Sequence, residues 1–227
     1  MSGGTRMRSD AQRNRAQLIR AAREVFVGVG PDAPLEEIAR RAGVGIATLY
    51  RRFPTREDLI RGVAVDTLTD LLTALDKLRA LGLDPYEVLR RFMHTALDMR
   101  IGAVMPAIAG RFAIEEVLRG VGRDAMLPLH EQLVEAQAEG LIRKDVVLGD
   151  ITLMIIRLSR PLPGDDIPED RGIAHRQLEV YLDGLRPAAA RERTTRLPRP
   201  AVGPGWFAKI RDRIARGGGA ESPPAAS

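Results

Sequence analysis

Residues 35–53, LEEIARRAGVGIATLYRRF, contain two short helical segments separated by a turn with two glycines. Apolar side chains recur through both segments at a spacing that packs two helices against each other at a steep angle. These side chains are Leu35, Ile38, Ala39, Ala42, Val44, Ala47 and Leu49. Gly43 stands where the first segment must end, because glycine enters the left-handed conformation without a Cβ penalty. The stretch therefore predicts a helix-turn-helix.

The second segment of this motif carries Thr48, Tyr50, Arg51 and Arg52. In helix-turn-helix proteins the second helix enters the major groove of DNA, where exposed polar side chains reach base edges and phosphates. The composition of this segment therefore indicates contact with double-stranded DNA.

The flanking residues predict two more helices around the motif. An apolar stripe at helical spacing precedes it, formed by Leu18, Ala22, Val25, Phe26 and Val29. Gly28 and Gly30 are expected to end this helix, and Pro34 is expected at the first position of the next helix. After Pro54, the pair Thr55 and Asp58 predicts a capping box at the start of a further helix.

The succession of GVGIATLYRRF, FPTREDL and a long helix resembles the DNA-binding domain of TetR/AcrR-type transcriptional regulators over residues 12–65. The resemblance implies an all-helical, dimeric repressor that a small molecule releases from DNA. It also implies that Arg56 lies on a phosphate. The DNA-binding residues that it implies are Gly45, Thr48, Tyr50, Arg51, Arg52 and Arg56. The family often has Ser or Thr before the helix that begins at Leu35, whereas this chain has Ala33-Pro34.

Charge is distributed unevenly along the chain. Residues 1–61 have a net charge of +5, residues 62–185 of −6 and residues 186–227 of +6. A basic head on an acidic body orients a protein on DNA, because Lys and Arg displace counterions from phosphates. The 32 Arg against three Lys are also typical of a GC-rich genome, but that bias does not explain the change of sign.

Residues 56–186 predict helices throughout, so the fold class is all-α. Expected helices cover Thr55–Ala80, a segment from Asp84 to Ile101, one through Leu133 that ends near Gly140, Gly149–Ser159 and Asp170–Leu185. The stretch 102–110 contains Pro106 and predicts a short or broken helix. Residues 141–148, LIRKDVVL, come nearest to the alternation of a strand.

This pattern divides the chain into four segments. We expect a disordered basic arm over residues 1–11, a helix-turn-helix domain over 12–65, and a helical ligand-binding and dimerisation domain over 66–186. Residues 187–227 are rich in Pro, Ala, Gly and Arg, a composition that predicts a largely disordered basic tail. A short basic amphipathic helix within the tail could dock on the body, on DNA or on an anionic membrane.

Two sets of apolar residues in the body are candidates for function. Methionine and aromatic side chains could line an apolar ligand pocket or simply form the core. The pocket candidates are Phe92, Met93, Met99, Met105, Phe112 and Met126. Apolar stripes on the last two helices could form a dimer surface or face their own core. The dimer candidates are Ile151, Met154, Ile155, Leu158, Leu178 and Tyr181.

Other classes of chemistry find little support in the sequence. The chain has no cysteine, no long apolar span and no signal peptide, so we expect a cytoplasmic location and no membrane partner. The three histidines lack the spacing of a local metal site. An acidic cluster at Asp165, Asp166, Glu169 and Asp170 is more typical of a solvated loop than of a cation site. We therefore expect no catalytic residue, no metal and no cofactor.

The sequence thus predicts a homodimeric DNA-binding regulator, with an operator and a small apolar or amphipathic effector as its partners. Two alternatives remain. A ligand-independent regulator or activator would have a filled core and no response to metabolites. A helical enzyme or interaction module with this head would show turnover or a protein partner without sequence-specific DNA binding.

Overall fold

The computed structural model describes residues 3–30, 32–102, 126–160 and 170–187. Within these ranges all regular secondary structure is helical, as the sequence predicts. The expected break at 102–110 and the tail after residue 187 lie almost entirely outside them. No helix in the described ranges is both long and apolar enough to cross a bilayer.

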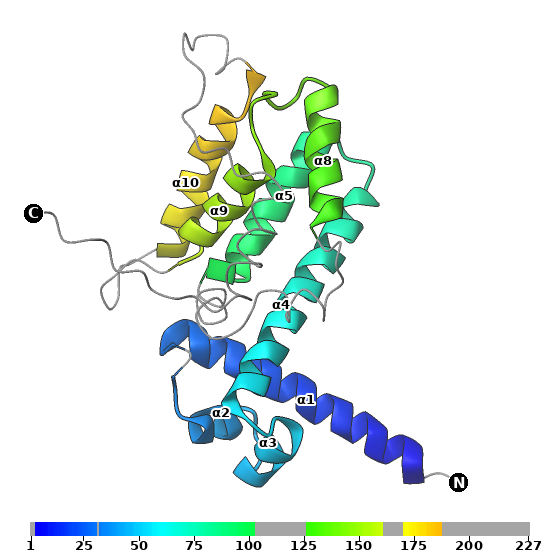
Figure 1. Ribbon diagram of the computed structural model, residues 1–227, viewed down its shortest axis with the longest axis vertical. Helices are drawn as coiled ribbons and strands as arrows, with labels where there is room; N and C mark the ends of the chain where they lie inside the picture. Colours follow the sequence, from blue (N-terminus) through cyan, green and yellow to red (C-terminus); the bar gives the residue numbers. More distant parts are fainter. Residues whose placement is uncertain (1–2, 31, 103–125, 161–169, 188–227) are drawn as a thin grey trace, which may run out of the picture.

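The head of the molecule consists of α1 (Gly3–Gly28), α2 (Leu35–Arg41), α3 (Ile46–Arg52) and the first half of α4 (Arg56–Arg79) (Figure 1). Its core joins the predicted apolar faces, with Leu18, Phe26, Ile38, Leu49 and Leu59 at most 2 % exposed. Helix α1 extends back to Gly3, through the segment predicted as a disordered arm. Residues 5–27 contain neither glycine nor proline, so no helix breaker interrupts it.

The ends of the head helices follow from particular residues. Gly43 has a φ of 68°, and the Gly43 and Val44 amides donate to the carbonyls of Arg40 and Ala39. This Schellman arrangement ends α2 as predicted. Pro34 is the N-cap of α2, one position earlier than expected. The predicted capping box is confirmed: the Asp58 amide donates to Thr55 Oγ1, and the Thr55 amide donates to Asp58 Oδ2.

The body is a helical bundle that packs against the second half of α4. It contains α5 (Pro85–Asp98), α8 (Leu127–Ala138), α9 (Leu148–Leu158) and α10 (Asp170–Gly184), whose bounds are close to those predicted (Figure 1). Asp84 caps α5 by accepting the Glu87 amide, and Pro85 follows at the first position of the helix.

Residues 141–147 form bends and a turn, and Leu148 begins α9, so the segment that came nearest to strand alternation is not a strand. The Gln137 side chain donates to the carbonyls of Arg143 and Val146, and the Arg143 amide donates to the carbonyl of Leu185. These bonds satisfy backbone groups that would otherwise need a sheet partner. The connection from α8 to α9 is thereby attached to the end of α10.

A charged contact holds α1 across α4 where the head meets the body. Arg23 Nη2 donates to Asp66 Oδ2 at 2.9 Å and to Asp70 Oδ2 at 3.1 Å. Burial and the neighbouring Asp70 charge raise the pKa of Asp66, against the opposing effect of Arg23. The guanidinium therefore separates two carboxylates of one helix that repel each other.

The chain just after the turn that follows α5 approaches α9 closely at Gly102. A Cβ built at this position would lie 2.0 Å from the carbonyl oxygen of Ile156. The Gly102 amide donates to Ser159 Oγ at 2.6 Å, and that hydroxyl donates to the Ile155 carbonyl at 2.6 Å. The position therefore admits only glycine without displacement of backbone.

Gly102→Ala should lower the free energy of unfolding by about 1–3 kcal/mol, because the added methyl group overpacks a contact with backbone. Gly184→Ala is the matched control, since a Cβ at Gly184 meets nothing within 4 Å. The control should be neutral or slightly stabilising. Urea denaturation followed by circular dichroism measures both variants. Equal stability of the two variants would show that α5 and α9 are not held this closely.

Candidate nucleic-acid interface

Helix α3 lies at the outer side of the head and buries little of its surface. Leu49 is its one fully buried residue and anchors the helix in the head core. Tyr50 is 47 % exposed although it is large and aromatic, and Arg51 and Arg52 are also exposed. A seven-residue helix gains little stability alone, so packing through Leu49 holds it in place.

Five of the predicted DNA-binding residues therefore lie together on α3 and its N-cap. Gly45 is the N-cap and is exposed, and a Cβ there would meet nothing within 4 Å. Thr48 is half-buried one turn further along the helix. The open space beside Gly45 would let a nucleic-acid backbone approach the start of the helix.

The arginines of α2 are paired with a carboxylate, whereas those of α3 are not. On α2, Arg40 and Arg41 donate to the Glu37 carboxylate at 2.7–2.8 Å, and these hydrogen bonds lower the pKa of Glu37 to about 2. On α3, neither Arg51 nor Arg52 bonds to another residue in the described ranges. The uncompensated positive charge of the motif therefore lies on α3, where a polyanion would contact it.

Arg56 has a structural contact that the sequence did not reveal. Its Nη1 donates to the carbonyl of Ala33 at 2.6 Å, and Ala33 is 3 % exposed. The side chain thus attaches the start of α4 to the turn before α2. A phosphate contact by Arg56 stays a prediction, and any such contact would come from a side chain that is already held in one position.

The predicted pocket residues divide into three groups. Phe92 and Met93 are fully buried in the body core, and Met99 and Met126 pack against that core while half-buried. Met105 and Phe112 lie outside the described residues. A hollow in the described structure lies elsewhere, at the ends of α5, α9 and α10. Its lining includes Leu97, Arg100, Leu158, Arg160, Arg171 and His175.

The predicted dimer surface needs a correction for three of its six residues. Ile151, Ile155 and Leu178 are 0 %, 3 % and 0 % exposed within a single chain, so they cannot give their side chains to a partner. Their stripes face the chain's own core, as the alternative interpretation held. Met154, Leu158 and Tyr181 are half-buried and stay candidates.

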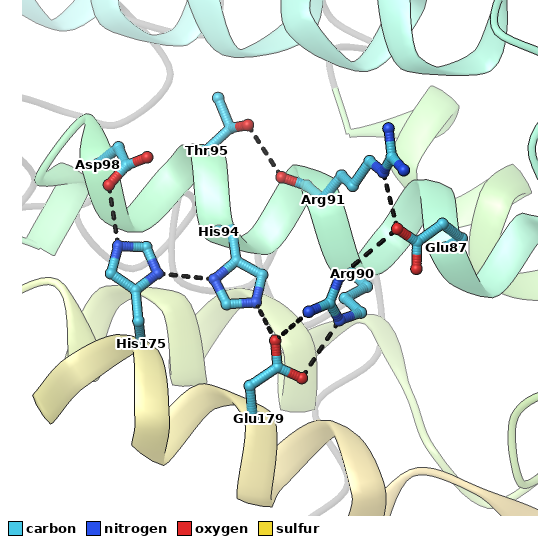
Figure 2. A network of polar contacts seen from close by, with 8 residues as sticks. All are labelled: Glu87, Arg90, Arg91, His94, Thr95, Asp98, His175 and Glu179. Carbon is cyan, nitrogen blue, oxygen red and sulfur yellow. Dashed lines mark hydrogen bonds and ion pairs between the residues drawn. The ribbon is translucent and has the colours of Figure 1, made fainter. Parts of the chain in front are cut away.

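Sequence reasoning missed a polar network between α5 and α10 (Figure 2). Helical spacing puts His94 on the polar side of α5 with Arg90, Arg91 and Asp98, where solvent would be expected to surround it. Its side chain is instead 21 % exposed and contacts His175 and Glu179 of α10. Arg90 also donates to Glu179, and Arg171 donates to Asp98. The partners are more than 70 residues apart in the chain, so helical periodicity alone could not have paired them.

Comparisons with known proteins agree with this geometry. Residues 18–63 match the family of bacterial regulatory proteins described as the tetR family, and residues 84–187 match the C-terminal domain of SbtR-like transcriptional regulators. The chain is 28 % identical over 169 residues to an HTH-type transcriptional regulator, Rv2250c, of Mycobacterium tuberculosis, covering 71 % of this chain and 86 % of the relative.

Solved structures give the same result. The TetR transcriptional regulator SCO0520 from Streptomyces coelicolor is 33 % identical, with a TM-score of 0.54, and the match covers 76 % of this chain and 98 % of that one. A TetR regulatory protein from Mycobacterium vanbaalenii is 30 % identical, with a TM-score of 0.56, over 79 % and 99 % of the two chains.

The exposed basic helix of a helix-turn-helix head, joined to a helical body, defines a DNA-binding transcriptional regulator. The matches over both parts of the chain show that it belongs to the TetR family.

The contact between Arg56 and Ala33 predicts a loss of stability on truncation. Arg56→Ala should lower the free energy of unfolding by about 1–3 kcal/mol, because it removes a charged donor from a buried carbonyl. Arg51→Ala is the matched control and should change stability by less than about 0.5 kcal/mol, as exposed substitutions usually do. Chemical denaturation measures both. A stable Arg56→Ala protein would contradict the structural role.

Proposed function

We propose that this regulator is a homodimeric repressor that leaves its operator when a small molecule binds the helical body. The observation that carries the DNA-binding part is the exposed face of α3, with Tyr50 and two uncompensated arginines on a helix that Leu49 and Ile46 anchor in the head core. The family gives the expectation of release by a ligand.

Two copies of the head are needed to read two half-sites, whose centres lie about 34–36 Å apart on one face of DNA or at a multiple of that distance. On α9 and α10, Met154, Leu158 and Tyr181 stay partly accessible in the single chain, and Val180 is 67 % exposed. These apolar groups support a dimer contact through the outer faces of the two helices.

The path from a ligand to the head would run through α4. This helix packs against α5 and α8 in the body and against α1 in the head. A ligand that changes the packing of the body helices would therefore change the position of α4. The body core consists largely of aliphatic side chains with a few aromatic and methionine ones, which supports an apolar or amphipathic ligand.

Arg52→Ala should weaken operator binding by about 1–3 kcal/mol if the guanidinium reads a base. Arg40→Ala is the control, because Arg40 is exposed on the neighbouring helix but is bonded to Glu37. Fluorescence anisotropy at fixed salt, with operator and scrambled DNA, measures both. A loss in Arg52→Ala that is equal on the two DNAs would indicate phosphate contact only, and no loss would remove Arg52 from the interface.

Ligand-driven release makes a thermodynamic prediction. A compound that weakens operator binding by some factor must bind the operator complex more weakly than the free protein by the same factor. Calorimetric titration of the free protein and of the complex, for compounds selected by thermal shift, tests this equality. If every compound that binds the body has equal affinity for both forms, the ligand-independent regulator is the correct alternative.

A further inference from the structure

Two histidines from different helices meet end to end in the body. The Nδ1 atoms of His94 on α5 and His175 on α10 are 2.6 Å apart, and their ring planes differ by 11° (Figure 2). The ring centroids are 4.9 Å apart, which exceeds the nitrogen separation by about one ring diameter. The rings therefore lie nearly in one plane, with their Nδ1 atoms directed at each other.

The outer nitrogen of each ring contacts a carboxylate. His94 Nε2 is 2.7 Å from Glu179 Oε1, and His175 Nε2 is 2.9 Å from Asp98 Oδ1. Hydrogen bonds from Arg90, and also from His94, lower the pKa of Glu179 against the effect of burial. Burial alone would raise the pKa of Asp98, but hydrogen bonds from Arg171 and His175 outweigh it, so the pKa is lowered.

Both carboxylates are thus ionised at neutral pH and can only accept hydrogen bonds, so each Nε2 must carry a hydrogen. The contact between the two Nδ1 atoms needs a third hydrogen, because two imidazole lone pairs do not attract each other. Two neutral imidazoles carry only two N–H hydrogens between them. The three contacts together therefore require one proton more than two neutral histidines supply.

We propose that His94 and His175 share one additional proton between their Nδ1 atoms, and that the resulting hydrogen bond holds α10 against α5. The pair is then a proton-binding site with a single positive charge. Loss of the proton leaves two lone pairs opposed, and gain of a second proton opposes two N–H groups. Either change breaks the contact between the rings.

The charges around the pair come from all three helices that end there. Arg90 and Arg171 balance Glu179 and Asp98, and Arg91 is paired with Glu87. Arg100 and Arg160 line the same hollow as His175 and repel added charge, whereas the two carboxylates lie at hydrogen-bond distance from the rings. Asp98 and Glu179 contact the rings, Arg90 and Arg171 bond to these carboxylates, and Arg100 and Arg160 line the hollow beside His175. Arg91 and Glu87 lie further along α5.

Proton linkage gives this arrangement a distinctive pH dependence. Unfolded histidines titrate near pH 6.5, at about the value of the free side chain. Below that pH the unfolded pair binds two protons and the folded pair one, so stability rises with pH. Above it the unfolded pair binds none and the folded pair one, so stability falls. The contribution of the pair to the free energy of unfolding is therefore greatest near pH 6.5. A single histidine paired with a carboxylate would instead give a contribution that changes in one direction with pH.

The test compares the full chain with His175→Asn between roughly pH 5 and 8, the range in which histidine charge changes. Urea denaturation at each pH gives the unfolding equilibrium constant of each protein, and we divide the constant of His175→Asn by that of the full chain. We expect this ratio to pass through a maximum, with slopes of up to tenfold per pH unit on each side. His130→Asn, on α8, is the control and should show no such maximum. A flat or monotonic ratio for His175→Asn would overturn the proposal.

A second measurement needs no variant that could fail to fold. In protein labelled with ¹⁵N-histidine, we expect both Nδ1 resonances to lie between the protonated and unprotonated values near pH 6.5 and to be coupled through one downfield proton. Two fully unprotonated Nδ1 signals would overturn the proposal. So would a rise in the melting temperature with Zn²⁺ that His175→Asn abolishes, since the occupant would then be a metal ion.

Discussion

One helix belongs to both hydrophobic cores of this protein. The first half of α4 contributes Leu59, Ile60 and Val63 to the head, and its second half contributes Leu71 and Leu75 to the body. Between them Thr67 is fully buried and donates its hydroxyl to the Val63 carbonyl, so the helix continues without an unsatisfied polar group. The position of the head therefore depends on how the body packs around the other end of α4.

The sequence predicted those parts of the fold that depend on local rules. Gly43, the capping box at Thr55 and the N-cap at Asp84 each satisfy backbone groups within a few residues, and each was identified from spacing alone. The basic α3 was found in the same way, since an exposed polar face next to a buried Leu49 follows from helical periodicity.

What the sequence could not predict depends on contacts between distant segments. His94 and His175 are 81 residues apart, and Arg56 reaches Ala33 across 23 residues, so neither pair has a periodic signature. Helical periodicity also does not distinguish an apolar stripe in a dimer interface from one in the chain's own core. Ile151 and Ile155 were compatible with both, and the structure shows that the core buries them.

The continuity of α4 also determines how sensitive the head is to its body. A helix of 24 residues is roughly 36 Å long. A tilt of about 5° at the body end would move the head end by about 3 Å, close to the rise of one base pair along B-DNA. In a two-fold symmetric dimer the two heads would move in opposite senses and the error would double. A small change in the packing of the body against α4 would thus move the head by about one base-pair step along DNA.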